Sequence, residues 1–221
     1  MDLSNLIQTV LIYALPVLFA ITVHEAAHGY AARHFGDNTA WMMGRITLNP
    51  LKHIDPIGTI AMPLLLYFAT SGAFLFGYAK PVPVDFSRLK NPKRDMAWVA
   101  LAGPGANFLM ALMWLILAIL LTAFKVDEVF PHRVAHAGVL ANVLMFAFNL
   151  IPIPPLDGGR VMTSILPNRL AYRFAKIEPY GFFIVLALLY FNVLAFWVGP
   201  MMMLANGALN VLATPLTMLI G

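Results

Sequence analysis

The chain alternates between long apolar stretches and short polar ones. The apolar stretches cover residues 6–23, 57–76, 96–124, 134–153 and 181–220. One helical crossing of a bilayer needs about 20 mostly apolar residues. The pattern therefore predicts an all-α polytopic membrane protein with about five to six membrane segments.

Breaks in this pattern predict where helices end. The Gly-Asp pair at residues 36–37 is typical of a helix stop after the first span. The Pro-Val-Pro-Val run at residues 81–84 cannot continue a helix, and its alternation predicts a short membrane-surface β element. The Gly-Pro pair at residues 199–200 predicts the turn of a C-terminal helical hairpin at about residues 180–220.

Composition separates this chain from soluble domains. Apolar residues make up 61% and charged residues 11% of its 221 residues, whereas an ordinary soluble domain has about 25% charged residues. A soluble fold would therefore expose large apolar patches. We expect one membrane-embedded domain over residues 1–221, with its core at about residues 6–160. The first apolar stretch follows no basic region, so we expect it to be retained rather than removed as a signal peptide.

Positive charge predicts the orientation. The net charge of +4 indicates membrane topology here rather than nucleic-acid binding, because Lys and Arg collect on the cytoplasmic side of membrane proteins. The segments placed in the cytoplasm are residues 24–56, 77–95 and 154–178. Every Lys and Arg except Lys125 and Arg133 then lies inside. Residues 57–76 have basic flanks on both sides and are expected to be re-entrant, with a plain transmembrane helix as the alternative.

Residues 24–28 have the sequence His-Glu-Ala-Ala-His, an HExxH motif. Side chains four residues apart share a face of a helix, so His24 and His28 can bind one Zn²⁺. Glu25 can then serve as the general base for an attacking water. Ionisable residues inside a membrane segment are costly and usually functional. We therefore interpret the motif as the core of an active site rather than as two satisfied histidines at a helix end.

A catalytic zinc site takes three protein ligands, and the chain has no cysteine to supply one. His34 has the spacing found in soluble metzincins, but on an unbroken helix it points about 280° away from His24. Asp157 follows the fourth apolar stretch and, in the predicted topology, lies at a similar depth to His28. Three prolines within residues 152–155 break the helix before it. Asp157 is the favoured third ligand, with an ordinary Asp-Gly turn as the alternative.

Three motifs in order resemble the site-2 protease family of intramembrane zinc proteases. They are HEAAH at 24–28, GPGAN at 103–107 and NLIPIPPLDGG at 149–159. The resemblance, which covers about residues 20–160, implies one zinc ion bound by His24, His28 and Asp157, and cleavage of a transmembrane segment near the cytoplasmic face. It also implies an active-site position for Asn149, whose amide can donate to an oxyanion. The chain resembles the minimal members, which lack a PDZ or CBS domain.

Weaker features have open interpretations. Asn107 either supports the active site or bonds a neighbouring helix. His53 lies in a loop that can fold back toward the metal. The segment at residues 77–95 either pairs with an unwound substrate as an added strand or forms a rigid surface loop. Small residues around Gly103 predict close packing of helices in lipid.

The predicted function is hydrolysis, by an intramembrane zinc metalloprotease, of a peptide bond in or near a transmembrane segment. Its partners are a transmembrane protein or peptide substrate and the lipid bilayer, with no nucleic acid. We expect a multi-pass protein of a prokaryotic plasma membrane with its active site toward the cytoplasm. Two alternatives stay open: an intramembrane metal transporter, which would not need Glu25, and a catalytically inactive relative that holds membrane clients.

Overall fold

The computed structural model describes residues 3–69 and 77–220, and within them it contains helices and no strands. The longer helices are α1 (Leu3–His34), α4 (Pro92–Ala123), α5 (Val129–Asn149) and α9 (Ala195–Ile220). The shorter helices are α2 (Thr39–Met42), α3 (Met62–Ala69), α6 (Asp157–Ile165), α7 (Asn168–Ala175) and α8 (Glu178–Tyr190). A π-helix at Pro56–Ala61 and 3-10 turns at Pro50–Lys52 and Phe86–Arg88 complete the described elements. The all-α prediction is confirmed for this part of the chain.

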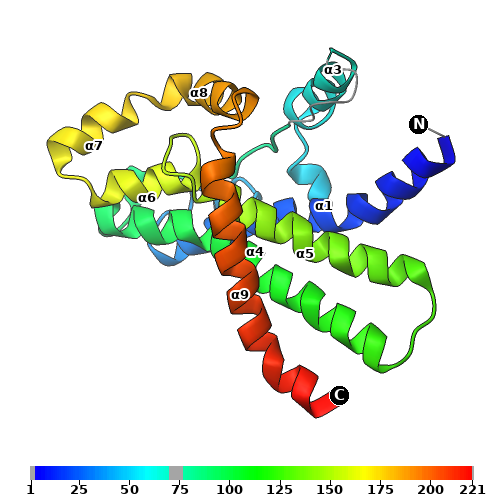
Figure 1. The fold of residues 1–221 in the computed structure, drawn as a ribbon. Helices are drawn as coiled ribbons and strands as arrows, with labels where there is room; N and C mark the ends of the chain where they lie inside the picture. Colours follow the sequence, from blue (N-terminus) through cyan, green and yellow to red (C-terminus); the bar gives the residue numbers. More distant parts are fainter. Residues whose placement is uncertain (1–2, 70–76, 221) are drawn as a thin grey trace.

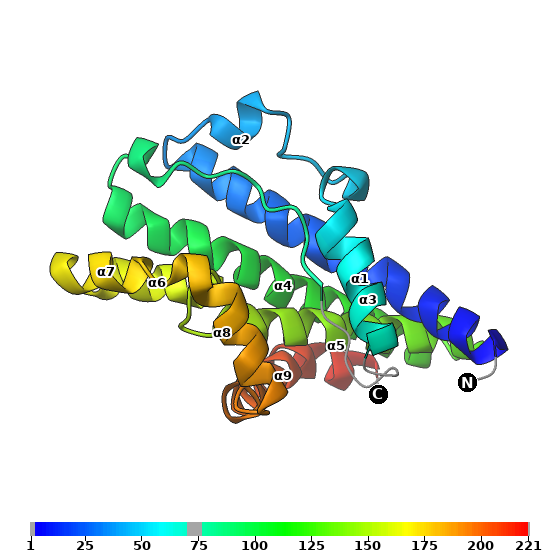
Figure 2. The same ribbon diagram turned by 90° about the horizontal axis from the view of Figure 1, so that it is seen from above.

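Three long helices form the centre of the molecule. α1, α4 and α5 pack against one another, α6 packs on α4, and α9 crosses α4 and α5 (Figures 1 and 2). One apolar cluster joins α4, α5 and α9, with Ala111 of α4, Val143 of α5 and Leu209 of α9 almost fully buried. A second cluster, which includes Ala32 of α1 and Val99 of α4, packs the C-terminal half of α1 against the N-terminal half of α4.

Three of the described helices are long and apolar enough to cross a membrane, namely α1 over Ile7–His34, α4 and α9. Their outward faces expose large apolar side chains such as Leu109, Met113 and Met203, which suits contact with lipid. α8 and the helical stretch Pro56–Phe68 are apolar but shorter. These findings support a membrane protein, and the expected five to six segments stay a prediction.

α1 ends where the sequence predicts. Gly36 has a φ of +114°, a conformation that glycine adopts readily. The N–H of Asp37 donates back to the carbonyl of Ala32 at 2.9 Å, as in a Schellman-type helix end. The buried Asp37 carboxylate then accepts hydrogen bonds from the backbone N–H groups of Thr39 and Asp85 at 2.9 and 2.7 Å. A distant segment is thereby tied to the end of α1.

The C-terminal helix break differs from the prediction. The chain turns at residues 191–194, between α8 and α9, and Asn192 adopts a φ of +56° there. The Gly199-Pro200 pair lies inside α9 instead. α9 continues through Pro200, as it does through Pro215 further on, so this pair did not mark the turn.

The apolar stretch at residues 57–76 is described only up to residue 69. Its two flanks lie side by side, because the N–H of Tyr78 donates to the carbonyl of Gly58 at 3.0 Å and the hydroxyl of Thr59 donates to the carbonyl of Tyr78 at 2.9 Å. Residues 70–76 lie outside the described part of the chain. A re-entrant path therefore remains a prediction.

The expected β element at residues 81–84 is not seen in the described structure. Residues 77–85 form neither helix nor paired strand and run beside the C-terminal half of α1 (Figure 2). Pro81 and Pro83 have no N–H to offer to a ladder, and the N–H of Val82 donates to a side chain of α1. The extended part of the prediction holds, but strand pairing is wrong, because two of the four residues at 81–84 are prolines and the N–H of Val82 is already bonded to α1.

Candidate active site

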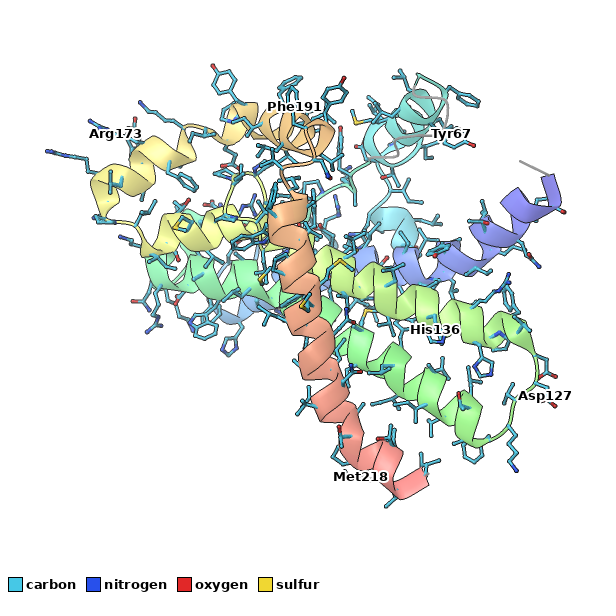
Figure 3. The ribbon with its side chains drawn as sticks, viewed as in Figure 1. Tyr67, Asp127, His136, Arg173, Phe191 and Met218 are labelled. Atoms are coloured by element: carbon cyan, nitrogen blue, oxygen red, sulfur yellow. The ribbon has the colours of Figure 1, made fainter. Side chains whose placement is uncertain are left out.

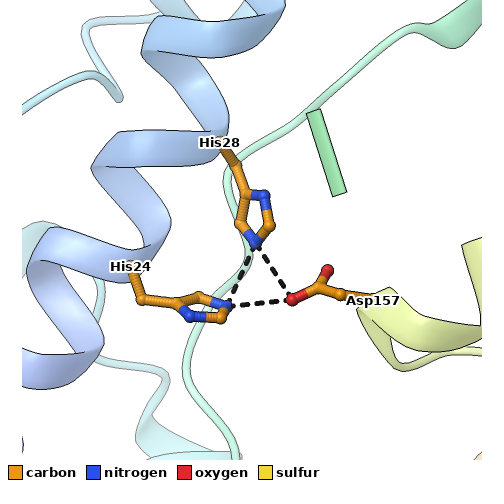
Figure 4. A group of neighbouring side chains, drawn as sticks. All are labelled: His24, His28 and Asp157. Carbon is orange, nitrogen blue, oxygen red and sulfur yellow. Dashed lines mark hydrogen bonds and ion pairs between the residues drawn. The ribbon is translucent and has the colours of Figure 1, made fainter. Parts of the chain in front are cut away.

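His24, His28 and Asp157 form a compact buried triangle. His24 and His28 lie one turn apart on α1, and Asp157 is the first residue of α6 (Figure 4). The two Nε2 atoms are 3.0 Å apart, and Asp157 Oδ2 lies 3.2 Å from His24 Nε2 and 3.3 Å from His28 Nε2. They are the residues within the described chain whose ligand atoms gather closely enough to hold a metal ion.

The hydrogen bonds around the two imidazoles fix their tautomers. His28 Nδ1 lies 2.7 Å from the carbonyl oxygen of Val99, and His24 Nδ1 lies 2.6 Å from Oδ1 of Asn107. A carbonyl oxygen can only accept, so each Nδ1 carries the hydrogen. In the neutral imidazoles each Nε2 then presents a lone pair, and both Nε2 atoms face the same point. This arrangement calls for a cation.

Asp157 fits the same conclusion. Its Oδ2 is buried and has no hydrogen-bond partner in the described structure, and it lies beside both Nε2 atoms. A tetrahedral site with metal–ligand distances of about 2.0–2.1 Å places its ligand atoms about 3.3 Å apart. The three observed separations, 3.0, 3.2 and 3.3 Å, are close to that value. The residues present therefore fit one tetrahedral metal ion.

Gly103 of α4 makes room for this site. A Cβ at this position would overlap His28 Nε2 and would come within 2.6 Å of His24 Cε1. The middle of α4 thus packs directly on both imidazoles because the residue there has no side chain. In contrast, a Cβ at Gly105, two residues further on, would meet nothing within 4 Å.

The Asp-Gly-Gly sequence positions the third ligand. Residues 150–156 leave the helical path after α5, and α6 starts at Asp157. A Cβ at Gly158 would lie 2.5 Å from the carbonyl oxygen of Ile151, and one at Gly159 would lie 2.5 Å from the carbonyl carbon of Ile153. The two glycines let α6 sit on the preceding loop, and this contact directs Asp157 toward α1.

A chain of amides supports His24. Asn107 of α4 donates through Nδ2 to the carbonyl of Ala20 at 3.1 Å and to Oδ1 of Asn142 at 3.0 Å. Asn142 of α5 donates in turn to the carbonyl of Gly138 at 2.9 Å. With both donors of Asn107 used this way, its Oδ1 must face His24. Sequence reasoning missed Asn142, although a lone amide inside an apolar span was a usable signal.

The other predicted site residues each have a hydrogen-bond partner outside the triangle of ligand atoms. Glu25 accepts a hydrogen bond from the N–H of Val82 at 2.7 Å. Asn149 ends α5, and its amide donates to the carbonyl of Met145 at 3.0 Å. His53 is buried, with Nε2 3.0 Å from the carbonyl oxygen of Thr47, and it is not part of the metal-ligand cluster.

His34 lies exposed at the end of α1, away from the buried ligand set, as the helical spacing predicts. The helix period turns a residue ten positions after His24 onto another face.

A buried set of two histidines and one aspartate, with a glutamate beside the first histidine, is the arrangement of a metallopeptidase site. The family model described as Peptidase family M50 matches residues 12–134 and 124–192. The chain therefore belongs to this family, the site-2 proteases. The resemblance drawn from the HEAAH, GPGAN and NLIPIPPLDGG motifs is confirmed.

Curated relatives agree with this assignment. The chain is 34% identical over 191 residues to "Putative zinc metalloprotease YwhC" of Bacillus subtilis, which covers 84% of this chain and 83% of the relative. It is 32% identical over 182 residues to "Putative zinc metalloprotease Rip2" of Mycolicibacterium smegmatis, covering 81% and 67%. "Zinc metalloprotease MJ0392" of Methanocaldococcus jannaschii is 24% identical over 153 residues, covering 69% and 34%. No solved structure matches the chain.

Proposed function

We propose that this peptidase is a zinc-dependent endopeptidase that hydrolyses a peptide bond in or near a transmembrane segment of another protein. One observation carries the proposal most strongly. The Nε2 atoms of two imidazoles and one buried carboxylate oxygen meet within 3.3 Å, beside a glutamate and inside apolar helices. Relatives that cover most of the chain are named as zinc metalloproteases, which supports zinc as the metal.

Each residue then has a chemical role. His24, His28 and Asp157 hold one zinc ion, which supplies Lewis acidity that polarises a peptide carbonyl and lowers the pKa of water. Glu25 takes a proton from the attacking water and delivers it to the leaving amine. The amide of Asn149 donates to the developing oxyanion through the second of its two N–H groups, since one already donates to the carbonyl of Met145.

The place of the site in the helices supports a membrane substrate. His24 and His28 lie in the second half of the candidate span Ile7–His34, so the site lies nearer to the end of the span than to its start. That end is the one placed in the cytoplasm by charge. Arg173 of α7 and Asp127 of the α4–α5 loop lie at opposite ends of the molecule (Figure 3), as that orientation requires. Cleavage near the cytoplasmic face follows from this placement.

The test separates metal binding from proton transfer. Purified Glu25→Gln should keep about one zinc per chain, measured by elemental analysis, yet lose cleavage of a reconstituted single-span probe protein by at least about 100-fold, because a general base contributes about 10²–10⁴ in rate. His24→Ala should lose zinc as well as activity. Undiminished cleavage by Glu25→Gln would remove the basis of the proposal.

The same liposomes distinguish the two alternatives. A metal transporter would carry zinc across the bilayer, and Glu25→Gln would leave that flux intact. An inactive client-binding relative would bind the probe and leave it whole. Chelator-sensitive cleavage without zinc flux is the result expected for a protease.

A further inference from the structure

The backbone N–H of Val82 contacts the carboxylate that the proposed mechanism uses as its base. The N–H lies 2.7 Å from Oε2 of Glu25. Glu25 and Gly29 are four residues apart and share one face of α1, and this face meets the segment of residues 77–85. Hydrogen bonds to a charged acceptor are about twice as strong as neutral ones. The contact therefore holds one oxygen of the carboxylate in place.

Close packing brings the segment onto this face. Val82 is only 6% exposed. A Cβ at Gly29 would lie 3.3 Å from Val82 Cγ1 and 2.9 Å from Ile46 Cγ1. The missing side chain at Gly29 lets the segment lie low enough on α1 to reach the carboxylate of Glu25.

The loop that follows α1 fixes the segment of residues 77–85 through several hydrogen bonds. The backbone N–H of Lys80 donates to the carbonyl of His53 at 2.9 Å. The buried guanidinium of Arg45 donates to the carbonyls of Lys80 and Pro81 at 3.0 and 3.2 Å. The N–H of Asp85 donates to Asp37, as described above. With these groups fixed, the N–H of Val82 has a defined position relative to α1.

The sequence leaves the N–H of Val82 as the one backbone donor at this point of the segment. Val82 lies between Pro81 and Pro83, neither of which has an N–H. The triplet therefore offers one backbone donor, and Glu25 receives it. Within the described part of the chain, the structure gives the other oxygen of Glu25, Oε1, no hydrogen bond. One oxygen is thus anchored while the other stays available.

We propose that the N–H of Val82, held by the clamped segment 77–85, is a positioning group that orients the Glu25 carboxylate for proton transfer. This inference rests on the proposed function, since it assigns a partner to the base of that reaction. Anchoring Oε2 restricts the rotamers of a long side chain that would otherwise be free to turn and directs Oε1 toward the attacking water. Ordering of a catalytic group before reaction lowers the barrier to the chemical step.

The test removes one hydrogen and keeps the side chain. Val82 is replaced by α-hydroxyisovaleric acid through nonsense suppression, which converts its N–H into an ester oxygen. The matched control carries the same replacement at Val84, which also follows a proline in this segment. Both proteins are reconstituted in liposomes with a single-span probe protein whose apolar segment contains a Gly-Pro break.

The ester at position 82 should lower kcat about 10- to 100-fold, as expected for a lost hydrogen bond to a charged group. KM should stay within about twofold and zinc content at one per chain. The ester at position 84 should leave all three values unchanged. An unchanged kcat at position 82 would overturn the inference, and so would a rise in KM alone, which would assign the segment to substrate binding, or a loss of zinc, which would assign it to structure.

A spectroscopic measurement checks the contact without any cleavage. In protein labelled with ¹⁵N-valine, the amide signal of Val82 should move upfield and lose hydrogen-exchange protection in Glu25→Ala. An unmoved signal would overturn the contact even if an ester protein failed to fold. The Glu25→Gln variant distinguishes a failure of the proposed function from a failure of the positioning role given to Val82. If it cleaves normally, the assigned base is wrong, whereas a dead Glu25→Gln with a normal position-82 ester contradicts only the positioning role.

Discussion

At the scale of single residues, the site depends on which atom carries which hydrogen. His24 can offer Nε2 to a metal only while Nδ1 holds the proton, and the Oδ1 of Asn107 enforces that state. Asn107 in turn faces His24 with its oxygen because its amide nitrogen donates to Ala20 and Asn142. Partners of this kind fix the tautomer and the ring orientation of a ligand histidine.

Asn107→Ala should therefore weaken zinc binding about 10- to 100-fold, the usual effect of losing the partner of a ligand histidine. Competition with a zinc chelator of known affinity measures the change. The matched control is Asn206→Ala, which alters an exposed asparagine on α9 and should bind zinc as the parent protein does. Equal affinities for all three proteins would contradict the role given to Asn107.

Gly103→Ala tests the close approach of α4 to the imidazoles. The added methyl group would overlap His28 Nε2, so the variant should hold less than about a tenth of the zinc of the parent protein while every ligand is still present. Gly105→Ala should bind zinc normally, because a Cβ there meets nothing within 4 Å. Elemental analysis after dialysis compares the two. Full zinc occupancy in Gly103→Ala would show that the helices can separate at little cost.

At the scale of elements, the sequence predicts what depends on local patterns. Apolar stretches locate α4 and α5 to within about five residues, and the Gly-Asp pair at 36–37 marks the end of α1. A helical period of 3.6 explains why His24 and His28 act together while His34 does not. The segment 77–85 could not be predicted in the same way. Its conformation is set by contacts with Arg45, Asp37 and Glu25, which are distant in sequence, and no local pattern encodes such contacts.

Asp37→Ala tests how firmly that segment is held. The change leaves the partly buried N–H groups of Thr39 and Asp85 without their acceptor, which should cost about 2–4 kcal/mol and lower Tm by roughly 5–10 °C. Thermal unfolding in detergent measures it. Asp127→Ala removes an exposed carboxylate and should leave Tm within about 1 °C. An equal Tm for both variants would show that the Asp37 contacts do not stabilise the fold.

At the scale of the whole molecule, the distribution of charge and the position of the apolar helices indicate the same orientation in the membrane. The basic α6–α7 region and the acidic α4–α5 loop occupy opposite ends of the structure (Figure 3). Between them, α1, α4 and α9 are apolar and long enough to cross a bilayer. Orientation in a membrane follows from Lys and Arg placement, so we expect the end with Arg173 to be cytoplasmic.

Labelling in cells checks this orientation directly. The chain has no cysteine, so each single substitution introduces one reactive thiol. Arg173→Cys should resist a membrane-impermeant maleimide until the cells are opened, whereas Asp127→Cys should react in intact cells. The reverse pattern would invert the proposed topology, and labelling of both positions from one side would contradict a crossing by α5, the helix between them.

The distance along the chain between the two histidines and the aspartate has a consequence for biosynthesis. His24 and His28 enter the membrane with the first helix, while Asp157 can reach them only after α4 and α5 have been inserted and the loop behind α5 has folded. A nascent chain that has left the ribosome only as far as α4 holds two of the three ligands and no complete metal site. The enzyme therefore gains its hydrolytic capacity late in its own synthesis, when its core is already assembled.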